Sequence, residues 1–376
     1  MIGTYCRGGS RTALMLCGFL LGCGGARMNA STAMSVAPGA SDFRRGMTLA
    51  NESKWADASV SFAGARAARP AWQDASLNLA ISLERAGQYE KAIDAYREVL
   101  TFAPDAPQAV GNLVRVLLEV GKISDAAAVL TPLVESHPES SEFALMHATV
   151  MRRAKRFDEA DRLAREVLLR EPGNVEALKS LATINADRGR LVLAETFFKN
   201  AQQVAPNDAG IVLNLGVLAH RQGDAVRALG FYEKALTLAP TMALAHANIG
   251  RVALQYRDYD RAIKELQTAV SGGVSDCETR TALGYALEGG RKGNEAIIAL
   301  SDVVSGCPGT EELQITMGLI CMTQLTNNKC ALDHFNRYLT THPELAKEHK
   351  VFQLIKAAKT SSPVDQSNNA GAETKS

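Results

Sequence analysis

Cysteines are the residues of this chain with the most distinctive chemistry, and there are seven: Cys6, Cys17, Cys23, Cys277, Cys307, Cys321 and Cys330. A thiol can pair with another thiol, accept an acyl chain or bind a metal ion. The first three lie near the N-terminus, and the other four form an even set far along the chain. An even set in an exported protein indicates disulfides. A zinc site is not expected, because no CxxC motif or Cys/His cluster of ligand spacing occurs.

The rest of the sequence gives no sign of catalysis. It contains no GxxxxGK[ST], GxSxG or HExxH motif and no GxGxxG that follows a strand. The histidines fall at positions that bear no relation to one another. We therefore predict that the protein is not an enzyme and has no catalytic residue, metal, cofactor or small-molecule substrate.

Composition narrows the fold class. The chain has 376 residues, with 41 Lys+Arg against 40 Asp+Glu and a formal charge of +1. This balance argues against a nucleic-acid partner, which usually requires a basic excess. A hydrophobic fraction of 46% excludes wholesale disorder, and the 6% of aromatic residues disfavours a large sheet. The bulk of the chain is expected to be helical.

The N-terminus has the pattern of an export signal. Arg7 and Arg11 precede an apolar stretch over 12–22 that is too short to span a bilayer, which takes about 20 residues. The sequence Leu20-Leu21-Gly22-Cys23 resembles the bacterial lipobox. That resemblance implies a signal peptide over 1–22 and acyl chains on the Cys23 thiol. It also implies retention at the outer membrane, because the next residue is glycine and not aspartate. The alternative is an ordinary signal cut further on, near Ala30.

Residues 23–38 have neither a helical nor a strand period, so we predict a flexible tether. Beyond them one interval dominates the sequence. Prolines recur every 34 residues, at Pro70, Pro104, Pro138, Pro172, Pro206 and Pro240. Alanines keep the same step, at Ala58, Ala92, Ala126, Ala160, Ala194, Ala228, Ala262 and Ala296, followed by Ala331 one residue late. A fixed period of this length indicates a repeat architecture.

The columns of a 34-residue window describe a helix pair. With the alanine as position twenty, position eight is nearly always small, position twenty-four is mostly bulky and position twenty-seven is apolar. Two small residues let two helices approach closely, and the bulky residue fills the space beside them. Gly87, Gly121, Gly189 and Gly223 supply the left-handed residue that ends the first helix. Proline ends the second helix.

These columns resemble the tetratricopeptide repeat over 39–343. The resemblance implies an all-α solenoid of about nine helix-turn-helix repeats, wound into a right-handed superhelix whose first helices line a concave groove. The apolar pattern over 344–359 predicts a helix that caps the last repeat. The segment 360–376 turns polar and is predicted to be a disordered tail.

The repeat places the four distal cysteines in pairs. Cys277 opens the first helix of the eighth copy and Cys307 ends its second, and these ends are neighbours in an antiparallel pair. Cys321 and Cys330 flank the turn of the ninth copy. We predict disulfides 277–307 and 321–330; the alternative is four buried thiols that act as small apolar residues.

A column of asparagines indicates where a partner binds. In the family that the repeat resembles, position six of the first helix commonly carries an asparagine that hydrogen-bonds an extended peptide. Here that position holds Asn78, Asn112, Asn214 and Asn248, and Arg115 and Arg251 follow two of them by three residues. An amide donates and accepts at once, and the guanidinium can meet acidic side chains. The alternative is that these asparagines only cap or bridge helices.

Together these features predict a noncatalytic scaffold, anchored by lipid to the periplasmic face of the outer membrane, that binds protein or peptide partners of the cell envelope. The layout is similar to the repeat lipoprotein of the myxobacterial gliding machinery. It is also similar to the pilotin that brings type IV pilus secretins to the outer membrane. An accessory activator of a cell-wall enzyme is a further alternative.

Overall fold

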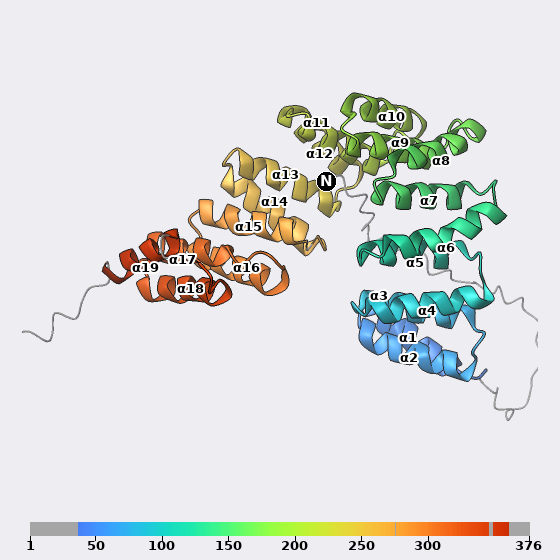
Figure 1. Cartoon of the computed structure of the whole chain (residues 1–376), viewed down its shortest axis with the longest axis horizontal. Helices are drawn as coiled ribbons and strands as arrows, with labels where there is room; N and C mark the ends of the chain where they lie inside the picture. The colour runs from blue at the N-terminus through green and yellow to red at the C-terminus, as the bar shows by residue number, and fades with distance from the viewer. Residues whose placement is uncertain (1–36, 275, 346–348, 361–376) are drawn as a thin grey trace, which may run out of the picture. The chain divides into compact units, whose positions relative to one another are not determined.

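The structure is a computed structural model that describes residues 37–274, 276–345 and 349–360. Within these ranges every regular element is an α-helix (Figure 1). The chain divides after Pro206 into two compact units. The predicted signal peptide and Cys23 lie outside the described residues, as do most of the predicted tether and nearly all of the predicted tail.

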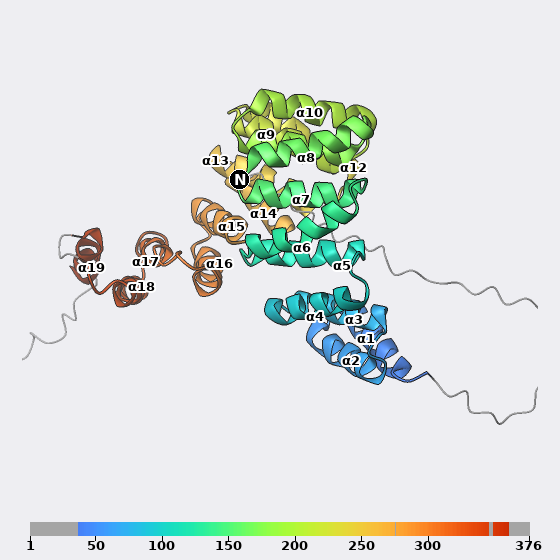
Figure 2. The ribbon, with the colours of Figure 1, turned by 45° about the vertical axis from the view of Figure 1, so that its right-hand side comes forward.

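Over its described residues, the first unit contains ten helices: α1 (Ala40–Asn51), α2 (Trp55–Ala68), α3 (Gln73–Arg85), α4 (Tyr89–Phe102), α5 (Pro107–Glu119), α6 (Ile123–Ser136), α7 (Ser141–Arg153), α8 (Phe157–Arg170), α9 (Val175–Asp187) and α10 (Leu191–Val204). They form five antiparallel pairs. Each pair also contacts the next along the chain, so the pairs follow one another in sequence order (Figure 2).

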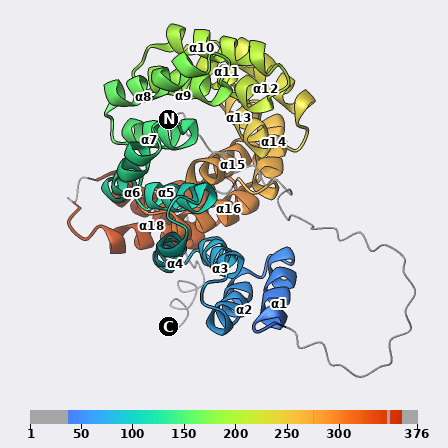
Figure 3. The ribbon, with the colours of Figure 1, turned by 90° about the vertical axis from the view of Figure 1, so that its right-hand side faces the viewer.

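The second unit contains the remaining helices: α11 (Ala209–Arg221), α12 (Ala225–Leu238), α13 (Ala243–Gln255), α14 (Tyr259–Ser271), α15 (Cys277–Gly289), α16 (Gly293–Gly306), α17 (Leu313–Thr323), α18 (Asn328–Thr341) and α19 (Lys350–Thr360). Four pairs follow one another here, and Figure 3 shows the first three of them, α11–α16, in sequence order. The last helix, α19, packs on α18 of the fourth pair (Figure 1). The predicted all-α solenoid of nine helix pairs is confirmed.

The repeat columns form the core. All nine alanines at position twenty are inaccessible to solvent. The bulky residues at position twenty-four are buried against them: Phe62, Tyr96, Leu130, Phe198, Tyr232, Leu266, Leu300 and Phe335. The small position eight is explained by direct contact. A Cβ added at Gly216 would lie 2.5 Å from Tyr232, and one at Gly250 would lie 2.6 Å from Leu266. The two helices of these repeats therefore touch through a residue without a side chain.

The turn within each repeat passes through a left-handed residue at position fifteen. Gly87, Gly121, Gly189 and Gly223 have φ between 75° and 83°, as predicted. The other repeats reach the same conformation without glycine, at Ser53, Lys155, Arg257, Arg291 and Thr326. The turn geometry is thus a property of the fold, because it persists where the residue type disfavours it.

The capping helix is shorter than predicted. Glu344 lies in a turn after Pro343, and α19 begins only at Lys350. The Nδ1 atom of His349 accepts a hydrogen bond from the Val351 backbone N–H (3.3 Å), which satisfies a donor of the first turn. The apolar pattern predicted that a helix exists here, and this local hydrogen bond helps to set the residue at which it begins.

Candidate partner-binding site

The asparagine column lies on the first helix of its repeats, as the sequence predicts. Asn78 on α3 and Asn112 on α5 belong to the first unit, and both are half-buried. The Asn78 side chain donates from Nδ2 to the backbone carbonyl of Asp74 (2.8 Å), one turn earlier in its own helix. That amide is therefore partly used within α3, and this bond neither caps the helix nor bridges it to another.

Asn112 belongs to a network that fixes Arg115. The Nη2 atom of Arg115 lies 3.4 Å from Asn112 Oδ1 and 2.7 Å from Glu84 Oε2, to which it donates. Glu84 comes from α3, in the preceding repeat, and its side chain is only 9% exposed. The same carboxylate oxygen accepts a hydrogen bond from the Tyr96 hydroxyl (2.9 Å). One carboxylate thus joins two adjacent repeats and orients the guanidinium.

Hydrogen bonding and burial favour the protonated forms of the two donors, Arg115 and Tyr96. The hydrogen bond to Glu84 raises the pKa of Arg115. Burial raises the pKa of the Tyr96 phenol, and the negative charge of Glu84 raises it further. Both donors therefore keep their protons over the physiological range. The network can therefore present the positive charge of Arg115 at a fixed position.

The second unit repeats the arrangement in part. Arg251 on α13 donates to the Oδ1 atom of Asn248, three residues earlier. Its Nε atom lies 3.8 Å from Glu278 Oε1 on α15, in the following repeat. Burial raises the pKa of the nearby Tyr232 phenol to about 12, and the charge of Arg251 opposes that shift. Asn248 is buried, whereas Asn214 on α11 is half-buried.

The two arginines are thus held in a similar way in the two units. Each donates to the asparagine three residues before it, and each lies beside a carboxylate from a neighbouring repeat. The side chain of Arg115 is 48% exposed and that of Arg251 is 33% exposed. Sequence reasoning found the Asn-x-x-Arg pairs but missed Glu84 and Glu278. A comparison of different positions in successive repeats, in addition to the same position in every repeat, would have found them.

A second surface lies on the first unit. A shallow groove crosses α2 and α4 and reaches the end of α3; its lining includes Val60, which is 72% exposed, Ala63, Leu83, Lys91 and Glu98. It is formed mainly by second helices of the repeats, whereas the asparagine column lies on first helices. Two different faces of this unit are therefore available to partners.

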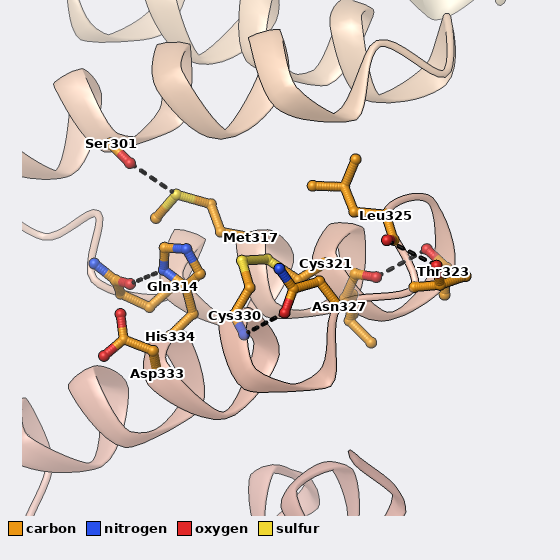
Figure 4. The surroundings of a disulfide bond; sticks show 12 residues. Ser301, Gln314, Met317, Cys321, Thr323, Leu325, Asn327, Cys330, Asp333 and His334 are labelled. Atoms are coloured by element: carbon orange, nitrogen blue, oxygen red, sulfur yellow. Dashed lines mark hydrogen bonds between the residues drawn. A yellow bond between two sulfur atoms is a disulfide. The ribbon is translucent and has the colours of Figure 1, made fainter. Parts of the chain in front are cut away.

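Both predicted disulfides are present in the structure. Cys277, the first residue of α15, is bonded to Cys307, which follows α16, with their Cα atoms 5.9 Å apart. Cys321 of α17 is bonded to Cys330 of α18, with a Cα–Cα distance of 5.8 Å (Figure 4). Each bond closes the two helices of one repeat.

One group of potential metal ligands escaped the sequence search. The ligand atoms of Cys321, Cys330 and His334 all lie within 4.8 Å of one another. The trio was missed because Cys321 comes from a different helix than the other two. The Cys330-x3-His334 spacing, which places both side chains on one face of a helix, is the signal that could have revealed it.

The membrane anchor predicted at Cys23 falls outside the described residues. Within the described residues, no helix combines the length and apolar character that crossing a bilayer requires.

Comparison with known families agrees with this architecture. Tetratricopeptide-repeat models match residues 43–107, 83–149 and 219–273, and a model of the fifth ARM repeats domain of TT21 matches residues 139–239. The chain is a solenoid of tetratricopeptide repeats. The matches cover parts of both units, so the family pattern is shared by the two.

The tetratricopeptide solenoid has relatives of known sequence and structure. It is 27% identical to mouse tetratricopeptide repeat protein 21A over 117 residues, which are 31% of this chain and 9% of that protein. A tetratricopeptide repeat protein of Parabacteroides merdae superimposes with a TM-score of 0.55 at 19% identity, over 66% of this chain and 98% of that one. The APC/C hetero-tetramer Cut9–Hcn1 gives 0.54 at 18% identity, over 84% of this chain and 62% of that one. The structural likenesses show the fold alone.

Proposed function

We propose that this protein is a noncatalytic scaffold that binds protein partners through the first-helix faces of its repeats. The observation that carries the proposal is the pair of partly exposed arginines, Arg115 and Arg251, each of which donates to the asparagine three residues before it. Arg115 is held further by its hydrogen bond to the buried Glu84 carboxylate. A side chain that is held in place before binding loses less entropy on binding. An arginine so held suits a peptide that offers a carboxylate or backbone carbonyls.

Photo-crosslinking in intact cells tests this function. A photoreactive residue replaces Gln108 on α5 or Gln255 on α13, two exposed positions that leave Arg115 and Arg251 in place. The matched control places it at Asn336, an exposed position on a second helix. We expect specific protein adducts at Gln108 and Gln255 and not at the control. We also expect Asn112→Ala to lower the adduct at Gln108 and Asn248→Ala to lower the adduct at Gln255, because each removes the asparagine that holds the arginine. Equal adducts at Asn336, or none at either first-helix position, would contradict the proposal.

The location that we propose for the scaffold is the periplasmic face of the outer membrane, where acyl chains on Cys23 would hold it. Support comes from the basic start, the short apolar stretch and the small residues before Cys23. A single acyl chain anchors only marginally, so several are needed for stable attachment. In the producing cell, Cys23→Ala should abolish incorporation of labelled fatty acid and release the protein from the membrane fraction. A mature N-terminus near Ala30 would instead support the ordinary signal peptide.

Within the envelope we propose a role in assembling a multiprotein machine, with the gliding apparatus as the first candidate. Nine repeats and a cap exceed the roughly six repeats usual in pilotins, which favours a larger scaffold. Deletion of the gene separates the candidates. A motility defect with normal secretin levels supports the gliding machinery, loss of secretin from the outer membrane supports a pilotin, and a cell-wall defect alone supports an enzyme activator.

A further inference from the structure

We propose that Cys321, Cys330 and His334 form a Zn²⁺ site when the disulfide between the two cysteines is reduced. Zinc accepts cysteine sulfur and histidine nitrogen, and sites with two cysteines, one histidine and one open position are known. The three ligand atoms already lie within 4.8 Å of one another. In a tetrahedral site with Zn–S bonds of about 2.3 Å, the two sulfurs stand about 3.8 Å apart. Opening the disulfide therefore requires only a small movement.

The backbone around the site holds the ligands in place. The Oδ1 atom of Asn327 accepts a hydrogen bond from the Cys330 N–H (3.0 Å), and the Asn327 N–H donates to the Cys321 carbonyl (2.8 Å). The turn between α17 and α18 is thus tied to both cysteines. His334 lies one helical turn after Cys330, so the two side chains share one face of α18.

A further contact orients the histidine. His334 Nδ1 donates to Gln314 Oε1 (2.8 Å), and Figure 4 shows the other side of the ring turned toward the two sulfurs. A hydrogen bond on one ring nitrogen leaves the lone pair on the other and fixes the ring, which is the usual arrangement around a zinc-bound histidine. Cys321 and His334 are both buried, and Cys321 belongs to the same core cluster as the apolar residues Phe335 and Val351.

The change from the disulfide to the Zn²⁺ site requires a reductant, and a dithiol supplies the electrons. That reductant delivers two electrons and two protons to the Cys321–Cys330 disulfide and itself becomes a disulfide. Zn²⁺ then binds both sulfurs as thiolates and releases the two protons. The disulfide and the metal are alternative cross-links between α17 and α18, so the last repeat stays closed in either state.

Metal titration of the full-length protein tests the inference. The reduced protein is titrated with Co²⁺, whose charge-transfer band reports sulfur ligation, and Zn²⁺ then displaces it. We expect one tightly bound ion in the wild type and in Cys277→Ser, Cys307→Ser. In Cys321→Ser, Cys330→Ser and in the oxidised wild type we expect the ion to be lost. Both double variants have the same N-terminal residues as the wild type, so any binding by cysteines there cancels in the comparison.

Two further variants test the histidine. His334→Ala should weaken Zn²⁺ binding at least tenfold, whereas the control His342→Ala should not change it. Gln314→Ala, which leaves all three ligands in place, should weaken it by about 10- to 100-fold, as is typical when an outer-shell partner is removed. Circular dichroism verifies the helical content of each variant. Equal binding by Cys321→Ser, Cys330→Ser, no binding by the reduced wild type, or wild-type binding by His334→Ala would overturn the site.

Discussion

In the first unit, position eight of repeats two to five holds Ala80, Val114, Ala148 and Ala182, whereas in the second unit it holds Gly216, Gly250, Gly284 and Gly318. In each repeat of the second unit, the backbone of the first helix at this glycine therefore lies directly against a side chain of the second helix. It also contains both disulfides. The first unit relies more on side chains: a single apolar cluster extends from Ala80 to Ile184. The same repeat can thus be stabilised by side-chain packing or by close approach and covalent closure.

Ion pairs between adjacent repeats occur in both units. In the first unit they include Arg66–Glu98, Lys122–Glu90, Arg115–Glu84, Arg152–Asp187 and Arg188–Asp158, and in the second Arg251–Glu278 and Arg261–Glu233. Most have exposed partners and contribute little, about 0–1 kcal/mol each. Arg152, with a side chain 6% exposed, and Glu84, with one 9% exposed, are exceptions, because removing one partner of a buried pair is costly. The main difference between the units therefore lies in the helix interface and the disulfides.

Reduction of the disulfides should have the largest effect, and only on the second unit. From the loop lengths of 30 and 9 residues, the chain-entropy relation gives about 3.6 and 2.6 kcal/mol. In metal-free buffer, reductant should lower the free energy of unfolding of the second unit by up to about 6 kcal/mol. Hydrogen exchange followed by mass spectrometry reads each unit separately. Equal loss of protection in α1–α10 would contradict the comparison.

Replacing two glycines of the same repeat by alanine should change the stability of the protein in opposite directions. Gly216→Ala places a methyl group against Tyr232 and should destabilise the protein by about 1–3 kcal/mol. Gly230 lies within α12 with open space around its Cα, so Gly230→Ala should stabilise it by about 0.5–1 kcal/mol. Urea denaturation measures both. A stabilising Gly216→Ala would mean that the close approach has no energetic role.

Acid should weaken the first unit through His147. This residue occupies position seven, where the second unit has Leu215, Ile249, Leu283 and Met317, and it is buried, with Nδ1 lacking a partner among the described atoms. Burial lowers its pKa, a shift that Glu159 opposes and Arg156 and Arg162 reinforce. The unfolded chain therefore binds the proton first.

The free energy of unfolding is therefore not reduced by protonation of His147 above the ordinary histidine pKa of about 6.5, and it declines as the pH falls below that value. His147→Leu should stabilise the protein by about 1 kcal/mol at pH 7 by removing an unsatisfied polar group, and by more at pH 5. Thermal denaturation across this pH range measures the effect. His220→Leu, an exposed position in the second unit, serves as the control. A pH profile unchanged by His147→Leu would exclude this residue as the acid-sensitive group.

The smallest predicted effect concerns the turns. Lys155 in the first unit and Arg257 in the second both have φ near 59°. Replacing either by glycine should stabilise the protein by about 0.5–1 kcal/mol, since the left-handed conformation costs other residues about 1–2 kcal/mol and glycine gives back part of this in chain entropy. Equal gains in the two units would show that the turn, unlike the helix interface, is built identically in both. A lower stability of either variant would indicate that the replaced side chain makes a stabilising contact.

The repeat interval was sufficient to predict the fold. The regular spacing of the alanines from Ala58 to Ala331 identified one core position in every repeat. It could do so because each helix pair must bury a small residue where its two helices meet. The disulfide pairs followed from the same register. The network around Arg115 could not be predicted, because Glu84 reaches it across a repeat boundary and no column analysis joins different positions. The beginning of α19 was misplaced because apolar spacing locates a helix but not its cap.

Each disulfide joins the two helices of a single repeat, so neither bond ties one repeat to another. A pull applied at the two ends of the chain would still peel repeats apart one by one. The two cross-linked hairpins would detach as closed rings, and the 30 and 9 residues inside them would stay out of the stretched path. At about 3.4 Å per residue this withholds roughly 100 Å and 30 Å of contour length. If the protein is anchored at Cys23, as we propose, the oxidised form would thus extend less far under force than the reduced, metal-free form.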